Sequence, residues 1–482
     1  MSSTIWLTDR SRYTTGTGRC ARERYLTNHA GPTGYGIVRK GESLPLMTGS
    51  YTHLPLERLY QYLQKHDQFP TREVIREAIA EGCTEYDKRI AERGFRGLLQ
   101  SERTDTIVKE QQYLIAGLIW AACKTVLPWI HTNYRIIQTE LESIYVLDCT
   151  CGLGSAVLDV AAHEAKDCQG IGQMLRQDAV AQKRVGNTLA YFEAKTTGWG
   201  GDNWAPQWET KPQLALGNLG LKERYGQDVS ENFIVALQKG SRKTSKPKDA
   251  FEEAVTRQES PFCYGYCSIG NPPLSADDWR HTYDYIDEKG QSRRVTRAHQ
   301  KRGVWELEQS DWPKYHAAKA ADPSLTPIEI WLQTMPQDAA ESQVYLIGPL
   351  NRQDVQIESL KRQVVGEERK WQRILWDLHT LTKLIWHDRP PTAPLDGWAY
   401  VWSHEMFQRR LDDLIPASWE CRRFGVKHEC QDKMLCFKET NWEDPLSVGL
   451  FVPRRPHHRP ELDQAVERGL LPAETEEAEE DD

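Results

Sequence analysis

The sequence lacks an uninterrupted apolar run of the length that a membrane span requires. Its longest apolar segment, over 105–131, contains Lys109, Glu110 and Lys124, whereas a transmembrane helix needs about 20 consecutive apolar residues. The start of the chain also lacks the pattern of a signal peptide. We therefore expect a soluble, cytoplasmic protein with no membrane partner.

An excess of positive charge is missing as well. The chain has 61 lysines and arginines against 69 aspartates and glutamates, for a formal net charge of -8, which argues against a uniformly basic nucleic-acid binder. The acidic residues that follow Pro472 account for most of this charge, so the rest of the chain is close to neutral and leaves room for a basic groove. Such an acidic run is typical of a solvated, disordered tail, which we expect over 451–482.

A set of paired cysteines is also absent, because the chain contains 11 cysteines, an odd number that argues against a disulfide scaffold. Cys421, Cys430 and Cys436 lie in a polar stretch, where thiolates fold around iron or zinc. Cys20 is the candidate fourth ligand, because the arginines beside it favour the thiolate form. The alternative is that these cysteines are small buried apolar residues. No ligand framework is evident for the others: Cys83, Cys123, Cys149, Cys151, Cys168, Cys263 and Cys267.

Apolar periodicity predicts an α/β protein with no internal repeat. Helical spacing predicts helices over 54–66, 71–92, 105–131 and 352–386. Segments rich in β-branched residues predict strands over 135–147, 174–182, 189–196 and 343–349. The chain then divides into the first part of a core over 1–221, a polar insertion or mobile subdomain over 222–340, the second part of the core over 341–450, and the acidic tail.

Three charged residues on two neighbouring strands carry the chemistry. Glu193 and Lys195 are two residues apart in a strand, so they project from the same face. Asp178 would lie on the preceding strand of a hairpin that turns at 184–187. Two carboxylates with a main-chain carbonyl form a hard-oxygen site for Mg²⁺ or Mn²⁺, and the lysine can orient water or stabilise charge on a phosphate. The alternative for a Glu-x-Lys pair alone is an exposed ion pair.

Further polar residues fit the same site. His53 follows Gly49 by four residues and would lie just before a helix, from which imidazole can reach a metal or phosphate; a capping or packing role is the alternative. Either Glu140 or Glu142, which share one face of the earlier strand, would add a carboxylate. Gln213 would lie in the first turn of a helix, where free backbone N–H groups can hold a phosphate.

These residues, taken in chain order, resemble the PD-(D/E)XK nucleases of the RecB type. They are more specifically similar to the branch with a four-iron, four-sulfur cluster, which includes CRISPR-associated adaptation nucleases and the nuclease domain of AddB-type helicase-nucleases. The resemblance covers about residues 10–60, 105–220 and 345–440. It implies a restriction-endonuclease-like α/β core with a mixed central sheet flanked by helices, plus the large insertion. The matching motifs are Cys20, Gly49-x-x-x-His53, Glu140, Asp178, Glu193-x-Lys195, Gln213, Cys421, Cys430 and Cys436.

The resemblance also implies an activity, namely metal-dependent hydrolysis of DNA from ends or in single strands. This activity would serve recombination, repair or phage DNA metabolism in a prokaryotic or phage-infected cell, with a helicase or recombination protein as a partner. Asp178, Glu193, Glu140 and His53 would bind Mg²⁺ or Mn²⁺, Lys195 would be catalytic, Gln213 would contact substrate, and Cys20, Cys421, Cys430 and Cys436 would hold a [4Fe-4S] cluster. The tyrosine that often follows the glutamine by four residues is Gly217 in this chain.

Two other functions remain open at this point. The segment 146–154 resembles the glycine-rich first motif of S-adenosylmethionine-dependent methyltransferases, and 271–274 resembles the catalytic loop of amino-methylating enzymes. The aromatic residue that usually ends that loop is missing, and no alternating strand-helix series follows Gly154. The third possibility is a non-catalytic scaffold that binds DNA or a helicase, although a pure binder has no need of Asp178, Glu193 and Lys195.

Overall fold

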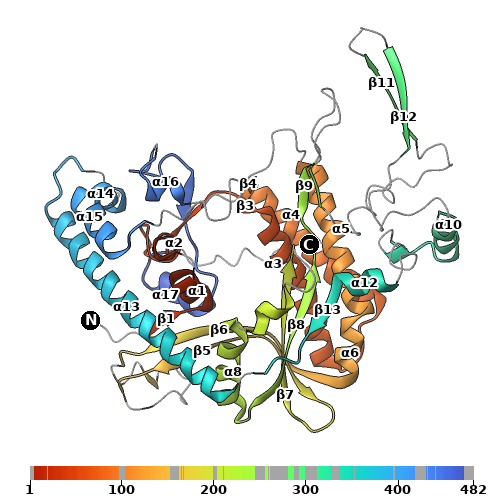
Figure 1. Ribbon diagram of the computed structural model, residues 1–482, viewed down its shortest axis with the longest axis horizontal. Helices are drawn as coiled ribbons and strands as arrows, with labels where there is room; N and C mark the ends of the chain where they lie inside the picture. Colours follow the sequence, from red (N-terminus) through yellow and green to blue (C-terminus); the bar gives the residue numbers. More distant parts are fainter. Residues whose placement is uncertain are drawn as a thin grey trace, which may run out of the picture.

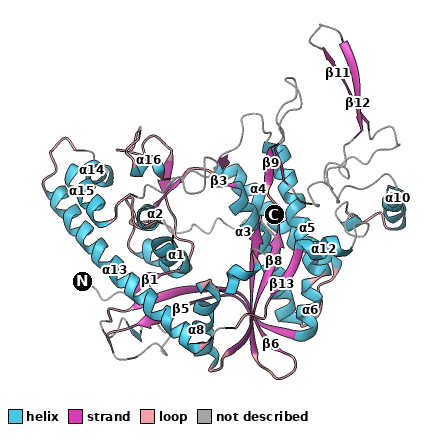
Figure 2. Ribbon diagram, in the orientation of Figure 1, coloured by secondary structure: helices cyan, strands magenta, loops and turns pink. Residues whose placement is uncertain are grey.

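The computed structural model gives an α/β fold with one mixed sheet between layers of helices (Figures 1 and 2). Its central sheet contains six strands, and the predicted mixed sheet flanked by helices is confirmed. The structure describes residues 5–18, 20–96, 104–151, 153, 162–163, 166, 168–198, 204–209, 211–244, 256–258, 260, 280–286, 292–298, 312–326, 329–330, 337–351, 353–393, 397–417, 430, 432–439 and 441–471.

The central sheet is built around one long strand, β6. The antiparallel strand β5 pairs with it along its length, whereas the parallel strand β1 pairs with its first residues and the antiparallel strand β7 with its last residues. The sheet then continues from β7 to the parallel strand β8 and the antiparallel strand β13. Its strands are β1 (Trp6–Thr8), β5 (Tyr134–Asp148), β6 (Ile171–Lys183), β7 (Leu189–Thr197), β8 (Val229–Gln238) and β13 (Val344–Ile347).

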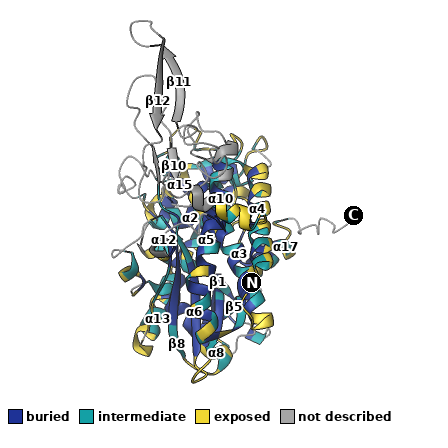
Figure 3. Cartoon of the chain, turned by 90° about the vertical axis from the view of Figure 1, so that its right-hand side faces the viewer, coloured by how far each residue is buried: buried dark blue, intermediate teal, exposed yellow. Residues whose placement is uncertain are grey.

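Both faces of the sheet are buried, as strands between two helical layers require. Successive residues of a strand point to opposite faces. Accordingly, Ala179 and Ala181 of β6 belong to one core cluster and Val180 to another. On β7, Phe192 and Tyr191 divide in the same way. The buried residues therefore concentrate in the strands and in the helix faces that cover them (Figure 3).

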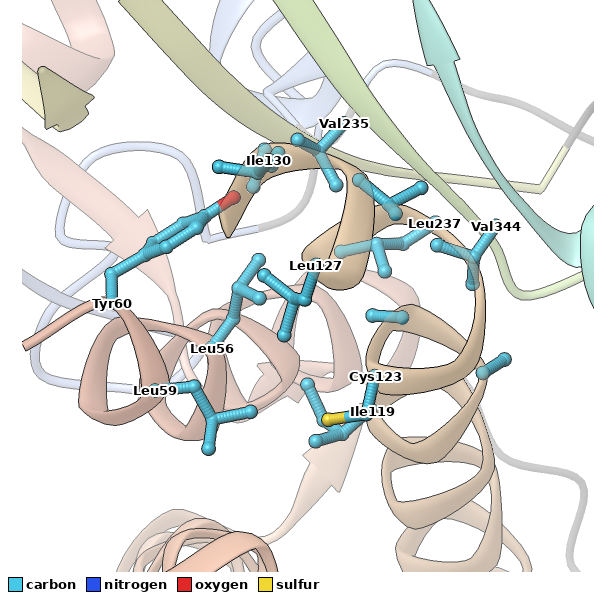
Figure 4. Close-up of a cluster of buried hydrophobic side chains, with 14 of the residues drawn as sticks. Leu56, Leu59, Tyr60, Ile119, Cys123, Leu127, Ile130, Val235, Leu237 and Val344 are labelled. Atoms are coloured by element: carbon cyan, nitrogen blue, oxygen red, sulfur yellow. The ribbon is translucent and has the colours of Figure 1, made fainter. Parts of the chain in front are cut away.

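The helices α3 (Leu44–His66), α4 (Arg72–Arg93), α5 (Thr104–Lys124) and α6 (Val126–Asn133) cover one face and form the largest core cluster with it. Figure 4 shows Leu56 and Tyr60 of α3 beside Leu127 and Ile130 of α6, near Val235 of the sheet. The single helix predicted over 105–131 is interrupted at Thr125. Pro128 explains the interruption, because proline cannot donate to the preceding turn but is tolerated in the first turn of a new helix.

One segment of this layer, Glu110–Asn133, is long and apolar enough to cross a membrane by length and composition. The expectation that no run reaches this length is therefore wrong. Of its most apolar window, 67% is buried inside the protein, and Leu114, Leu118 and Leu127 of this segment are fully buried in the largest core cluster. This burial is that of a core helix, consistent with the expectation of a soluble protein.

The other face of the sheet is covered by α8 (Pro212–Tyr225) and the first half of α13 (Asp354–His387). The second half of α13 continues past the sheet to the group of helices α14 (Gly397–Ser403), α15 (Glu405–Leu414) and α16 (Lys433–Cys436) (Figure 1). There it meets α2 (Ala21–Asn28), and Trp371, Trp402 and Leu26 lie together in a second core. This second core therefore joins the beginning and the end of the chain.

The expected disordered tail does not begin at 451. Residues 451–471 carry the strand β14 (Phe451–Pro453), which pairs with β2 (Ile37–Arg39), and the helix α17 (Arg459–Glu467). Glu461 of α17 forms a buried ion pair with Arg12 of α1 (Arg10–Gly18). The acidic run from 472 onward lies outside the described residues.

The expected insertion over 222–340 also begins too early. It includes β8, whose apolar residues 233–237 are buried between the two helical layers. The core therefore extends at least to Gln238. The remaining elements are β9 (Arg242–Thr244), β10 (Thr256–Gln258), β11 (Arg280–Ile286), β12 (Ser292–Ala298), α10 (Trp312–Ala321), α12 (Gln337–Gln343), the short strands β3 (Glu42–Ser43) and β4 (Phe95–Arg96), and the 3-10 helix η1 (Ala205–Glu209).

Candidate active site and metal-ligating groups

A cavity of about 550 Å³ lies where β5, β6 and β7 meet α1, α3 and α8. The structure brings all the predicted active-site residues to this cavity, although they are spread over 161 positions of the chain. They are His53, Glu140, Asp178, Glu193, Lys195 and Gln213. Of the predicted cysteine ligands, the three that the structure describes, Cys20, Cys430 and Cys436, do not line it.

Asp178 and Glu193 face each other across the β6–β7 hairpin. Their neighbours Ala179 and Phe192 are paired in the antiparallel register, and the backbone N–H of Ala194 donates to Asp178 Oδ2 at 2.7 Å. Because side chains alternate along a strand, Glu193 and Lys195 point to the same face as Tyr191. The predicted hairpin is therefore present, with its turn between Lys183 and Leu189.

Glu193 is the most enclosed carboxylate of the site, with only 1% of its surface exposed. Its Oε1 atom accepts from Lys195 Nζ and Gln213 Nε2, and its Oε2 atom accepts from the Tyr191 hydroxyl. Burial and the negative charge of Asp178 together raise the pKa of Glu193 to about 7, although the positive charge of Lys195 opposes this shift. The site therefore holds a carboxyl group that a bound cation would convert to its charged form.

His53 reaches the cavity from inside α3, not from a position before a helix as predicted. Its Nδ1 atom lies 3.7 Å from Asp178 Oδ2. Burial lowers the pKa of His53 to about 4, opposed by Asp178 and supported by the cations Lys195 and Arg176. The imidazole is therefore neutral near pH 7 and retains a lone pair for a metal.

Gly49 explains how α3 comes so close to β7. A Cβ atom at this position would lie 2.6 Å from Thr196 Oγ1, a distance at which neighbouring atoms would have to move. The glycine thus permits the approach that carries His53, one helical turn later, to the carboxylates.

Glu140 adds a third carboxylate to the cavity. It lies between Thr139 and Leu141, whose partners on β6 are Ala179 and Gln177, so it stands opposite Asp178. Burial, with the charge of Asp178, raises the pKa of Glu140 to about 7 although Arg176 forms an ion pair with it. Of the two glutamates left open by the sequence, Glu140 is the one that lines the cavity.

Gln213 lies in the first turn of α8, as predicted, and its Oε1 atom is buried without a hydrogen-bond partner. One turn later, a Cβ atom added to Gly217 would lie 3.1 Å from the ring of Tyr191. The resemblance leads one to expect a tyrosine at position 217. The ring of Tyr191 occupies the space that the side chain of such a tyrosine would enter. The tyrosine that donates to Glu193 therefore comes from β7 and not from α8.

Several residues of the cavity were not predicted from the sequence. Asp9, His457 and His458 have their ligand atoms within 4.8 Å of one another, and they line the same cavity. Arg12 lies 3.7 Å from Asp9, and Arg454 lies 3.1 Å from His457. Arg12 is also paired with Glu461, so the Asp9 carboxylate belongs to a buried network of ion pairs beside the cavity.

A second metal-ligating group lies between the end of β5 and the start of β6. It is formed by Cys149, Cys151, His163 and Cys168, whose ligand atoms are all within 4.8 Å of one another, and we call it the cysteine–histidine group. The expectation that these cysteines form no framework is wrong, because the two antiparallel strands bring both ends of their connecting loop together. The group could bind a metal ion.

The predicted iron–sulfur cysteines are described in part, since Cys421 lies outside the described residues. Cys20 directly precedes α2, Cys430 lies shortly before α16, and Cys436 is the last residue of α16. Burial raises the pKa of the Cys436 thiol, and the charges of Cys430 and Cys20 raise it further, while Arg22 lowers it. Cys436 and Ala21, the residue after Cys20, pack against the same second core.

The methyltransferase motifs gain no support from this arrangement. β5, which leads into the glycine-rich segment, is followed by its antiparallel neighbour β6, whereas a doubly wound sheet needs a parallel strand after a helical crossover. Two residues of that segment belong to the cysteine–histidine group. The second motif, over 271–274, lies outside the described residues.

The two raised carboxyl pKa values predict a pH dependence of stability. Without metal, the free energy of unfolding should fall as pH rises from about 4.5 to about 7. In the folded state the pKa values of Glu140 and Glu193 are about 7, above the usual 4.5. The folded state therefore binds more protons than the unfolded state in this pH range, and a rise in pH disfavours it. Melting curves in chelator should show this fall, and Mn²⁺ should reverse it at pH 8. The fall should be smaller in Glu193→Gln; an equal or larger fall in that variant would contradict the assignment.

No known family profile matches this chain, and no curated protein matches it.

Proposed function

We propose that the protein is a metal-dependent DNA nuclease with a PD-(D/E)XK core, which hydrolyses phosphodiesters at DNA ends or in single strands. The observation that carries the proposal is the convergence of Asp178, Glu193 and Lys195 in one cavity, with His53 in contact distance of Asp178. This set is suited to phosphoryl transfer. It combines two carboxylates from adjoining strands, a lysine two residues after one of these carboxylates, and a neutral imidazole.

The donor set fits a hard divalent cation. Asp178 and Glu193 offer carboxylate oxygens and His53 a neutral nitrogen, which together suit Mg²⁺ or Mn²⁺. When bound there, the cation would polarise a phosphate oxygen and lower the pKa of a coordinated water molecule. The buried, unpaired Oε1 atom of Gln213 supplies an acceptor for water or substrate beside these ligands.

Lys195 has a separate role in the proposal. Its ammonium group contacts Glu193 Oε1, and 25% of its side chain is exposed to the cavity. It can therefore reach a phosphate that enters the cavity and stabilise the negative charge that develops in the transition state.

The charges around the carboxylates suit an anionic polymer. Arg10 and Lys239 line the cavity with Lys195, and burial lowers the pKa of Lys239 to about 8. A cavity with cations on its rim attracts phosphates although the chain as a whole is acidic. We therefore expect DNA affinity to fall steeply with salt concentration.

We also propose the [4Fe-4S] cluster at Cys20, Cys421, Cys430 and Cys436. Its support is that Cys436 and Ala21, the residue after Cys20, pack against the same core of the two chain ends. Iron analysis and visible absorption of anaerobically purified protein test this part independently of nuclease activity. The Cys430→Ala variant should lose iron, and a colourless, iron-free wild type would contradict it.

The nuclease proposal is tested by incubating anaerobically purified protein with end-labelled single-stranded and double-stranded DNA. We expect cutting with Mg²⁺ or Mn²⁺ and none with chelator, and the labelled products report the preferred end. DNA binding without cutting under every metal condition would favour the scaffold function. Methyl transfer from labelled S-adenosylmethionine, without cutting, would favour the methyltransferase.

A further inference from the structure

The cysteine–histidine group has the donor set of a closed metal site. Three sulfur atoms and one imidazole nitrogen lie within 4.8 Å of one another, and Cys151 Sγ is 3.2 Å from His163 Nδ1. In a tetrahedral zinc site with bonds of about 2.3 Å to sulfur, neighbouring sulfur atoms are about 3.8 Å apart. The spacing in the protein therefore leaves room for one ion at the centre of the group.

The surroundings of the group support metal ligation more than apolar packing. Cys168 and His163 are completely buried. A polar imidazole is thus buried among the sulfur atoms, with its Nδ1 atom against the sulfur of Cys151. Cysteines that only fill an apolar core need no such neighbour, whereas a metal site needs its histidine ligand in that position.

The loop backbone is tightened around the same point. The N–H groups of Lys166 and Cys168 donate to the carbonyl of His163, and that of Gln169 donates to Thr150 Oγ1 at 2.9 Å. Gly170 follows directly, and a Cβ atom there would lie 2.7 Å from the carbonyl oxygen of Asp148. The end of β5 and the start of β6 thus approach so closely that a side chain at position 170 would clash with the backbone of Asp148.

We propose that the cysteine–histidine group binds one Zn²⁺ ion whose role is structural. Three thiolates with one imidazole are a typical ligand set for tetrahedral zinc, and four protein ligands leave no open position for a substrate. An iron–sulfur cluster with several irons would hold its thiolates farther apart than a single ion does. The three cysteines and the histidine of the group all come from one segment of 20 residues, Cys149 to Cys168.

The position of the ion explains what it would stabilise. Cys168 packs with Ile5, which precedes β1, with Leu7 of β1, and with Met174, which lines the cavity. Asp9 follows β1 directly and lines the cavity as well. Zinc would therefore fix the conformation of the segment that connects β5 and β6, against which β1 packs. Through β1 it would stabilise the position of Asp9 in the wall of the cavity. This inference does not depend on the proposed nuclease activity.

The test is the metal content of the full-length protein, purified without chelator and measured by mass spectrometry. We expect one zinc per chain in the wild type, its loss in Cys168→Ser, and its retention in Cys123→Ser, which changes another buried cysteine outside the group. Cys430→Ser should retain zinc even where it loses iron. A wild type without zinc, or with iron lost in Cys168→Ser, would overturn the proposal.

A second measurement covers the case in which Cys168→Ser does not fold. Wild-type protein is stripped of metal and reconstituted with Co²⁺, whose visible bands report tetrahedral coordination and whose near-ultraviolet bands report thiolate bonds. We expect both at one equivalent, and added Zn²⁺ should abolish them. Absence of the thiolate bands from protein that remains folded by circular dichroism would overturn the proposal.

Discussion

Replacement of Lys195 by alanine is expected to slow DNA hydrolysis by about 10²- to 10³-fold, the usual effect of removing one group that stabilises transition-state charge. The ammonium contacts Glu193 at the wall of the cavity, and no other lysine is placed on the same strand face within the described part of β7. The measurement is the rate of cutting at saturating Mn²⁺, so that a change in metal affinity does not enter the comparison.

Lys183→Ala is the matched control for this variant. Lys183 also lies on a strand of the central sheet and forms an ion pair with a glutamate, Glu231, at 2.8 Å, but it does not line the cavity. We expect its rate to equal that of the wild type. Undiminished cutting by Lys195→Ala would contradict the catalytic role, and equal losses in both variants would indicate damage to the sheet instead. Lys195→Arg, which keeps the charge, should recover part of the rate.

The parts of the site that were predictable are those that local sequence determines. Asp178, Glu193 and Lys195 lie within one hairpin, and the alternation of side chains along strands places two of them on one face. Gln213 follows Pro212, and proline marks the first turn of a helix. Such patterns extend over a few residues, so no knowledge of the distant chain is needed to recognise them.

His53 shows where local patterns fail. Apolar spacing predicted a helix that begins at residue 54, yet α3 begins at Leu44 and passes through Pro55, although proline is rare inside helices. The ring is accommodated by a long-range contact: a Cβ atom on Gly82 of α4 would lie 2.8 Å from Pro55 Cδ. The helix boundary thus depends on a residue 27 positions away, which periodicity within α3 does not reveal.

Asp9, His457 and His458 were beyond prediction for a similar reason. They come from opposite ends of the chain, and the apparent tail of acidic composition concealed the ordered residues 451–471. The cysteine–histidine group was different, because its signal is present in the sequence. A Cys-x-Cys pair follows one strand, and a histidine precedes a cysteine by five residues before the next strand. The second separation is in the range found for zinc ligands, whereas the first is shorter than usual.

The two ends of the chain, which the proposed iron–sulfur cluster would tie together, are also joined by other contacts. The described residues show buried ion pairs in addition to an apolar core. Arg24 Nη2 and Glu368 Oε2 are 2.6 Å apart, with both side chains fully buried. Trp6 Nε1 donates to the same carboxylate at 2.9 Å, and the Arg24 guanidinium lies 4.5 Å from the centre of the Trp371 ring. The ends are therefore held by contacts that need no metal.

Replacement of Glu368 by alanine is accordingly expected to lower the free energy of unfolding by about 3–5 kcal/mol, because it leaves the Arg24 charge buried without its partner. The indole N–H of Trp6 would lose its acceptor as well. The loss should appear in denaturant unfolding of wild type and variant at one pH, under conditions where metal content is measured and equal. Since this ion pair orders β1 and α2 against α13, the N-terminal segment should also become more accessible to hydrogen exchange.

Glu358→Ala separates this effect from a general weakening of α13, since Glu358 lies on the same helix but is exposed, and we expect it to change stability by less than about 0.5 kcal/mol. Replacing both partners, in Arg24→Met with Glu368→Leu, removes the uncompensated charge and should restore most of the lost stability. A double variant as unstable as Glu368→Ala would show that the loss comes from packing around Trp371 and not from the isolated charge. A Glu368→Ala protein as stable as the wild type would show that the ends of the chain are held by the apolar core alone.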